Sequence, residues 1–136
     1  MISLRNVEKK YGKFQALHPL ELQVQKGEVF GFLGPNGAGK TTTIRMLAGV
    51  LTPTNGTIHI NGLNIVEQPV ESKKHVGYIP DRPYLYDKLT AREFLLFVGQ
   101  LYGLSVKKIK ERGDKLLQEN DLLDRVDELI EAYSHG

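Results

Sequence analysis

The chain has 136 residues, a length typical of one domain that can bury a core. Its 40% hydrophobic and 25% charged residues are ordinary for a soluble globular protein, and a net charge of +2 is too small to indicate binding to nucleic acid. There is no cysteine, which excludes disulfides and thiolate metal sites, and neither a signal segment nor an apolar run of about 18 residues is present, so the sequence predicts a soluble, cytoplasmic chain.

The first elements are predicted by the spacing of apolar residues. Apolar and polar residues alternate over residues 2–9 and again over 20–24, which predicts two half-buried strands. Residues 28–33 form a compact apolar run, which is typical of a strand buried on both faces of a parallel sheet. A glycine-rich turn follows, and helical spacing over residues 41–48 predicts a helix that ends at Gly49.

Shorter elements are predicted after this helix. Residues 53–56 read as a turn and 57–60 as a short strand, followed by Asn61-Gly62, the strongest hairpin signal in the chain. Residues 67–74 predict a short helix, and residues 75–79 predict another strand.

The pattern becomes helical near Tyr84. Thr90 and Glu93 have the spacing of a capping box, which opens an amphipathic helix, and Ser105 is the predicted N-cap of a second helix. The sequence therefore predicts a β-rich unit over residues 1–83 and a helical unit over residues 84–136.

One motif carries clear chemistry. It consists of Gly34, Pro35, Asn36, Gly37, Ala38, Gly39, Lys40 and Thr41, with Thr42 directly after it. These residues match the phosphate-loop pattern G-x-x-x-x-G-K-[ST] in full. A glycine-rich turn without a ligand is the alternative, but the order of predicted strand, loop and helix favours binding of a nucleoside triphosphate with Mg²⁺.

The residue types in the motif suit a triphosphate. The glycines let backbone N–H groups point inward without a Cβ in the way, and the helix N-terminus adds unpaired donors. Lys40 supplies a positive charge for the β- and γ-phosphates, and the Thr41 hydroxyl is a predicted Mg²⁺ ligand. Thr42 adds one hydrogen bond, expected at the α-phosphate.

The surroundings of the loop resemble those of ABC transporter ATP-binding subunits along the whole chain. The resemblance rests first on the loop region, where Gly27-Glu28 precedes the loop and Pro-Asn-Gly-Ala stands between the fixed positions of its pattern. It rests further on three later segments: Met46-Leu-Ala-Gly49, residues 53–56 and 60–62, and Val76-Gly-Tyr-Ile-Pro80 leading into Leu89-Thr90. The resemblance implies an α/β fold, that of a P-loop NTPase with an ABC-type nucleotide-binding domain. It further implies that this domain is truncated here: a β-rich ATP-binding core is followed by only the start of the helical subdomain.

The resemblance also assigns roles to single residues. Tyr11 takes the place of the aromatic ring that stacks on adenine. Phe14 and Ala16 either line the same pocket or pack into the core. Ser134 matches the serine of the signature motif, which in the family caps the γ-phosphate held by the opposite subunit.

Asp81 departs from the family pattern. The family's coupling loop usually has Gln after the residue matching Pro80. Asp81 is either a Mg²⁺ ligand, since its carboxylate oxygens suit that ion, or an ordinary acidic turn residue. An acidic residue at this position favours a resemblance to the exporter-like branch of the family.

The family's later catalytic parts do not appear in the sequence. Hydrolysis in the family needs an apolar strand ending in Asp-Glu, an Asp loop and a distal His, and none of these is found. We therefore expect a truncated chain, ending inside the signature motif, that binds ATP but does not hydrolyse it alone.

Three functions remain open on the sequence. The first is the motor subunit of an ABC transporter, with a transmembrane permease and a second nucleotide-binding subunit as partners, which places the chain on the cytoplasmic side of the cell membrane through the permease. The second is a non-catalytic ATP-binding regulatory module. The third is a phosphate-loop kinase or GTPase, which lacks support because neither a phosphoacceptor site nor a guanine-reading Asn-Lys-x-Asp motif is found.

Overall fold

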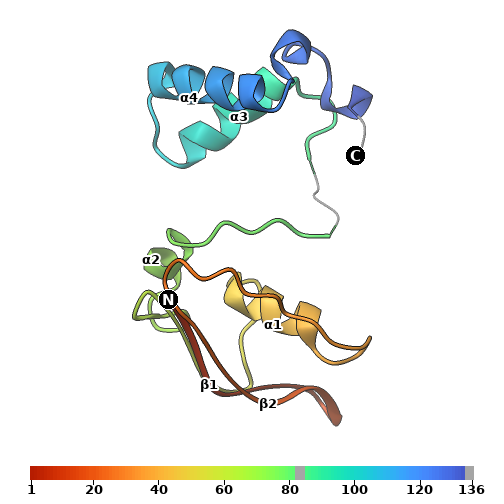
Figure 1. Ribbon diagram of the computed structural model, residues 1–136, viewed down its shortest axis with the longest axis vertical. Helices are drawn as coiled ribbons and strands as arrows, with labels where there is room; N and C mark the ends of the chain where they lie inside the picture. Colours follow the sequence, from red (N-terminus) through yellow and green to blue (C-terminus); the bar gives the residue numbers. More distant parts are fainter. Residues whose placement is uncertain (82–84, 134–136) are drawn as a thin grey trace. The chain divides into compact units, whose positions relative to one another are not determined.

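The structure is a computed structural model that describes residues 1–81 and 85–133. The chain divides into two compact units, Met1–Ile79 and Pro80–Gly136 (Figure 1). The division falls shortly before residue 83, the boundary expected from the sequence. Each unit has a hydrophobic core of its own.

The first unit is built on one antiparallel sheet. Its strands are β1 (Ile2–Tyr11), β2 (Phe14–Val24), β3 (Asn55–Ile60) and β4 (Leu63–Asn64), in the order β2-β1-β3-β4. All three pairings are antiparallel. The strands predicted at residues 2–9, 20–24 and 57–60 are therefore present, and β2 begins earlier than predicted.

A bulge in β1 sets which side chains reach the core. Leu4 and Val7 are both fully buried although they are three residues apart, and the register with both neighbouring strands shifts between them. An extra residue in a strand turns the following side chains to the other face. Gly56 on β3 makes room for the bulge, because a Cβ at this position would lie 2.2 Å from the Asn6 carbonyl oxygen.

The core of the first unit lies between the sheet and the helix α1 (Lys40–Leu47). Its buried members are Leu4, Val7, Leu17, Met46, Ile58, Ile60 and Ile65. The helix ends as predicted, since the N–H groups of Gly49 and Val50 bond to the carbonyls of Met46 and Arg45. The Asn61-Gly62 hairpin and a short helix, α2 (Pro69–Lys73), are also confirmed.

Two predicted strands are wrong. Residues 28–33 and 75–79 form no strand, and no pairing segment for them exists in the described parts of the chain. Val29 and Leu33 are 99% and 91% exposed, and Ile79 is 88% exposed. An apolar run becomes a strand only when neighbouring backbone pairs with it, and the parallel sheet expected around residues 28–33 is not formed here.

The second unit is helical. Its elements are α3 (Ala91–Leu101), α4 (Val106–Glu119) and the 3₁₀ turns η1 (Leu123–Arg125) and η2 (Ile130–Ala132). The helices α3 and α4 lie side by side (Figure 1). Both predicted caps are confirmed, with a complete capping box at Thr90 and Glu93 and a Ser105 hydroxyl that accepts from the Lys108 N–H.

The second core joins the helices to the turns that follow. Ala91, Leu117 and Val126 are buried together, with Leu95, Leu122 and Tyr133 packed around them. Arg92 on α3 forms ion pairs with Asp114 on α4 and with Asp127 after η1. In the part of the chain that the structure describes, no helix has the length and apolar character needed to span a membrane.

Candidate nucleotide-binding site

The phosphate-loop motif forms a tight turn at the N-terminus of α1. Gly37 and Gly39 both have φ of 84°, in the left-handed region, and the Ala38 N–H donates to the Pro35 carbonyl at 3.3 Å. Side chains with a Cβ rarely adopt this backbone, so the glycines are required by the conformation itself. The turn leads directly from the loop residues into the first residues of α1.

The loop is held from behind by β2. A Cβ on Gly39 would lie 2.7 Å from Leu17 Cδ1 and 2.9 Å from the Ala16 carbonyl oxygen. The backbone of Gly39 therefore packs directly on the strand, and no larger residue fits. This contact connects the position of the loop to the sheet of the first unit.

The N-terminus of α1 presents backbone donors to the loop. Gly39 provides no side-chain cap, and the first turn contains no acidic residue. The first intrahelical bond is that of the Thr43 N–H to the Gly39 carbonyl at 2.9 Å, and the Thr43 hydroxyl donates to the same oxygen. Uncapped N–H groups and the positive end of the helix dipole make this turn suitable for an anion.

Lys40 adds a positive charge at the same place. Its ammonium group donates to the carbonyl oxygens of Gly34 and Pro35, at 2.6 and 2.8 Å. The side chain thus folds back over the loop, and its charge lies at the start of the same turn. Phosphate oxygens are the ligands that such a combination of ammonium and N–H groups prefers.

Thr41 and Thr42 begin the helix beside Lys40. Thr41 is exposed and Thr42 is half-buried. In the described residues no group of three or more His, Cys, Asp or Glu side chains is placed to hold a metal. The predicted role of the Thr41 hydroxyl as a Mg²⁺ ligand stays a prediction.

Two aromatic residues flank the turn between β1 and β2. Tyr11 and Phe14 are directly paired across the strands, and their exposed fractions are 52% and 68%. The Lys9 ammonium lies 5.2 Å from the centre of the Tyr11 ring. Packing of Phe14 into the core, one of the two predictions for it, is wrong, whereas Ala16 is half-buried. Both rings are accessible to a flat ligand.

The family described as ABC transporter matches residues 17–136, which is most of the chain. The chain belongs to the ABC transporter family. A solved structure of an ATP-binding subunit of an ABC transporter superposes with a TM-score of 0.86 at 32% identity, covering 98% of this chain and 55% of that one. The predicted ABC-type ATP-binding fold is confirmed.

Relatives in the ABC transporter family span the chain from end to end. A linearmycin resistance ATP-binding protein of Bacillus subtilis (strain 168) is 38% identical over all 136 residues, which are 44% of its length. A Nod factor export ATP-binding protein of Cupriavidus metallidurans is 40% identical over the same residues, 45% of its length. The chain thus spans less than half the length of these relatives.

Two of the residues assigned from the family pattern lie outside the first unit, Asp81 in the second unit and Ser134 beyond the described residues. Asp81 is exposed and belongs to the second unit, so its role as a Mg²⁺ ligand stays a prediction. Ser134 lies outside the described residues. Tyr133 before it is half-buried, and its hydroxyl donates to the Arg125 carbonyl at 2.6 Å. Burial raises the pKa of the Tyr133 phenol.

The structure adds two residues that the sequence reasoning missed. Thr43 is fully buried and fixes the Gly39 carbonyl, and Leu17 supports Gly39 from the sheet. Thr43 stands four residues after Gly39, so the spacing of one helical turn predicts its contact. The Leu17 contact joins segments far apart in the sequence, and no local pattern indicates it.

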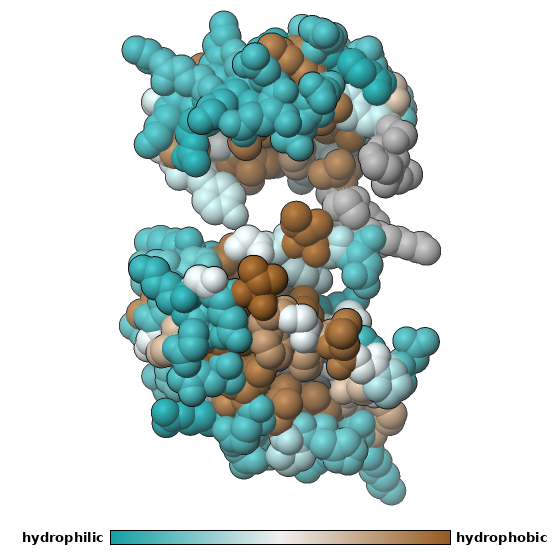
Figure 2. Space-filling view, in the orientation of Figure 1, coloured by the Kyte–Doolittle hydropathy of each residue, from teal (hydrophilic) through white to brown (hydrophobic). Residues whose placement is uncertain are grey.

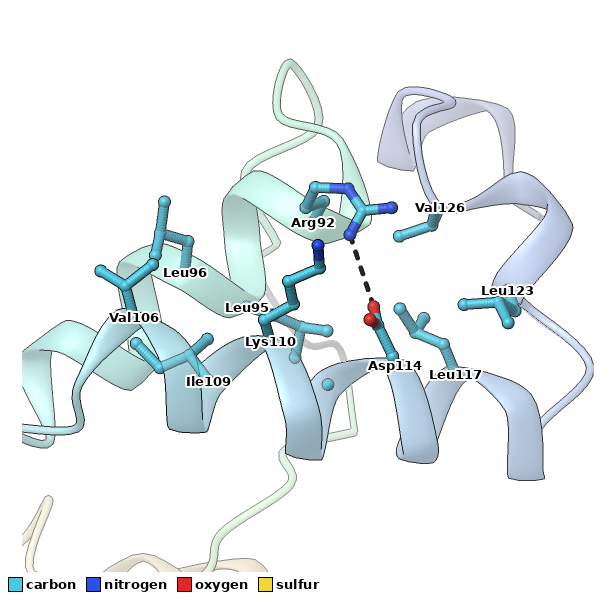
Figure 3. A pocket seen from close by; sticks show the side chains of 11 residues that line it. Arg92, Leu95, Leu96, Val106, Ile109, Lys110, Asp114, Leu117, Leu123 and Val126 are labelled. Carbon is cyan, nitrogen blue, oxygen red and sulfur yellow. Dashed lines mark hydrogen bonds and ion pairs between the residues drawn. The ribbon is translucent and has the colours of Figure 1, made fainter.

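The second unit of this ABC transporter family chain contains an apolar groove of about 500 Å³ between α3 and α4 (Figure 3). Leu95, Ile109 and Leu117 line it, and Arg92 and Asp114 lie at its edge. These two charges are paired at 3.4 Å. The groove therefore offers apolar contact, with the Arg92–Asp114 ion pair and Lys110 as its charged lining.

Proposed function

We propose that this chain binds ATP with Mg²⁺ as part of the motor subunit of an ABC transporter, which in its full-length form couples ATP hydrolysis to membrane transport. The observation that carries the proposal is the turn at residues 34–42. Its left-handed glycines, the uncapped start of α1 and the Lys40 ammonium lie together in a chain of this family.

Each residue of the turn has a proposed role. Backbone N–H groups from Gly37 to Thr42 bind the phosphates, with Lys40 at the β- and γ-phosphates. Bound Mg²⁺ offsets the phosphate charge, and the Thr41 hydroxyl would hold it. Tyr11 stacks on the adenine ring, which its exposure allows.

We assign hydrolysis to the whole protein and not to these 136 residues. The sequence has one Asp-Glu pair, Asp127-Glu128, and it follows a 3₁₀ turn instead of an apolar strand. Both carboxylates are ion-paired, Asp127 with Arg92 at 3.0 Å and Glu128 with Arg125 at 2.7 Å. Because this pair follows a 3₁₀ turn in the helical unit and forms ion pairs there, we do not assign it the role of the catalytic glutamate.

The proposed partners follow from the family. A transmembrane permease receives the conformational change, and a second nucleotide-binding subunit closes the ATP site in a head-to-tail dimer through Ser134. The chain then lies on the cytoplasmic side of the membrane, held there by the permease. Relatives named for export and drug resistance, together with Asp81 in the coupling loop, favour an exporter-like system.

The proposal is tested by calorimetric titration of the purified chain with ATP and Mg²⁺, with phosphate release measured in parallel. We expect binding by the parent chain and loss of about 2 kcal/mol or more in Lys40→Ala, because a charged hydrogen-bond donor is removed from an anion site. Phosphate release should stay at the level of Lys40→Ala.

Lys107→Ala is the matched control, because Lys107 is an exposed lysine on α4 in the second unit. It should bind ATP as the parent does. Equal affinity of the parent and Lys40→Ala would refute the phosphate-binding site. Turnover above the Lys40→Ala background would show that the chain hydrolyses ATP by itself. The regulatory module would be favoured instead if the chain binds ATP without turnover and its full-length relatives also fail to hydrolyse ATP.

A further inference from the structure

Glu8 is the one charged side chain among the buried residues of the described chain, with 8% of its surface exposed. Its carboxylate accepts hydrogen bonds from Asn55 Nδ2, from Gln15 Nε2 at 3.3 Å and from Lys10 Nζ at 3.4 Å. These donors lower the pKa of Glu8, with Asn55 contributing most. The carboxylate is thus charged and fully engaged.

The bonds of Glu8 tie three strands together. Glu8 and Lys10 belong to β1, Gln15 to β2 and Asn55 to β3. The register of β1 with β2 shifts twice between Val7 and Lys10, so the regular ladder is interrupted where Glu8 lies. Where the backbone hydrogen bonds between the strands are interrupted, the side-chain hydrogen bonds to Glu8 hold the strands together.

This network is linked to the phosphate loop by side-chain contacts and to Tyr11 by the strand β1. Tyr11 stands three residues after Glu8 on the same strand. Gln15 Nε2, which donates to Glu8, also donates to the Leu17 carbonyl at 2.5 Å, and the Leu17 side chain supports Gly39 of the phosphate loop. A path of contacts therefore runs from Glu8 through Gln15 and Leu17 to the loop, and the backbone of β1 joins Glu8 to Tyr11.

We propose that Glu8 is a positioning residue that sets Tyr11 relative to the phosphate loop, so that one nucleotide is held by its base and its phosphates together. The proposal rests on the proposed function of ATP binding. Glu8 touches no part of the ligand; it acts through Gln15 and the strand that carries Tyr11. When Tyr11 and the phosphate loop are already fixed in the free protein, less conformational entropy is lost on binding, and the affinity for the nucleotide is higher.

A purely structural role explains a charge at this position less well. Burying a carboxylate costs free energy, and an apolar residue of similar size is often as stable or more so. A carboxylate, however, accepts several hydrogen bonds at once from different directions. It can therefore fix Lys10, Gln15 and Asn55 in one arrangement, which an apolar side chain cannot do.

The test compares two ligands on the full chain, Mg²⁺-ATP and Mg²⁺-tripolyphosphate, by calorimetry. Tripolyphosphate has the phosphates but no base, so it reports the loop alone. Tyr11→Ala provides the reference for loss of the base contact. We expect Glu8→Gln to weaken ATP binding about fivefold or more, equivalent to about 1 kcal/mol, and to leave tripolyphosphate binding unchanged.

Two further variants separate positioning from stability. Gln15→Met removes the bridge without changing charge and should give the same split between the two ligands. Glu21→Gln is the control: its carboxylate accepts from the Asn6 N–H at 2.6 Å in the same sheet, away from Tyr11. It should change neither affinity, whatever its effect on unfolding.

The outcomes distinguish this inference from the function on which it rests. If the parent chain binds neither ligand, the proposed function fails. If the parent binds ATP and Tyr11→Ala weakens it, while Glu8→Gln and Gln15→Met bind as the parent does, positioning by Glu8 is overturned. Equal weakening of ATP and tripolyphosphate in both variants also overturns it. The proposal is supported if the double variant Glu8→Gln/Tyr11→Ala loses less ATP affinity than the sum of the two single variants. Such non-additivity means that both substitutions remove the same contact, that of Tyr11 with the base.

Discussion

Two glycines of the phosphate loop share a backbone conformation but differ in what surrounds them. Gly37 and Gly39 have the same φ of 84°. A Cβ added to Gly37 meets nothing within 4 Å, whereas one added to Gly39 meets Leu17 and the Ala16 carbonyl. The motif pattern requires glycine at position 39 and leaves position 37 open, whereas the structure shows a left-handed backbone at both and a further steric reason for glycine at Gly39.

We therefore expect Gly39→Ala to destabilise the first unit more than Gly37→Ala. The left-handed backbone alone costs an alanine about 1 kcal/mol, and this is the expected loss for Gly37→Ala. Gly39→Ala adds the overlap with β2, for a total of about 2–4 kcal/mol. Urea unfolding followed by circular dichroism measures both losses. Equal losses in the two variants would mean that β2 moves aside without cost.

Among the elements, those whose ends are marked in the sequence formed as predicted. The capping box at Thr90 and the N-cap at Ser105 use side chains within one helical turn, so a short sequence window contains the whole interaction. The same holds for the Asn61-Gly62 hairpin. Residues 28–33 and 75–79 differ, because a strand depends on a partner elsewhere in the chain, and their apolar character does not say whether that partner is present.

The two helix caps of the second unit should differ in strength. Thr90 accepts from the Glu93 N–H at 3.2 Å, and the Glu93 carboxylate accepts from the Thr90 N–H at 2.8 Å. Ser105 has one bond, to the Lys108 N–H, at 3.4 Å. We expect Thr90→Ala to cost about 1–2 kcal/mol and Ser105→Ala about 0.5 kcal/mol. Thermal unfolding of both variants checks the order, and a larger loss for Ser105→Ala would contradict it.

On the scale of the whole molecule, the sequence predicted local features better than contacts between distant segments. The turn from Gly34 to Thr42 lies within one short stretch of sequence, so a local motif is enough to predict it, while the ligand roles of its residues stay predictions. The contacts of Glu8 with Gln15 and Asn55, and of Leu17 with Gly39, join distant segments, and only the folded sheet reveals them. Roles that need a second chain, such as that of Ser134, remain predictions.

Exposed apolar side chains should make the chain associate. Figure 2 shows a broad area of hydrophobic side chains on the face of the first unit that it presents. Val29, Leu33 and Ile79 are the most exposed large apolar residues described in this unit. Contiguous apolar surface favours association because contact removes it from water.

Sedimentation velocity over a range of concentrations tests this expectation. The parent chain should shift to larger species as its concentration rises, and Val29→Lys should reduce that shift. Val70→Lys, at an exposed position on α2, is the matched control and should associate as the parent does. A parent chain that stays monomeric throughout would disprove the expectation.

The two cores have a consequence for how the chain can vary. The buried residues of the first cluster all precede Ile79, and those of the second all follow Pro80. A helical unit transplanted from a relative that is 38% identical therefore brings its own interior and leaves the sheet's interior native. Chimaeras joined near Pro80 therefore test whether the helical half determines the pairing with the proposed permease, while the half that carries the phosphate loop is held constant.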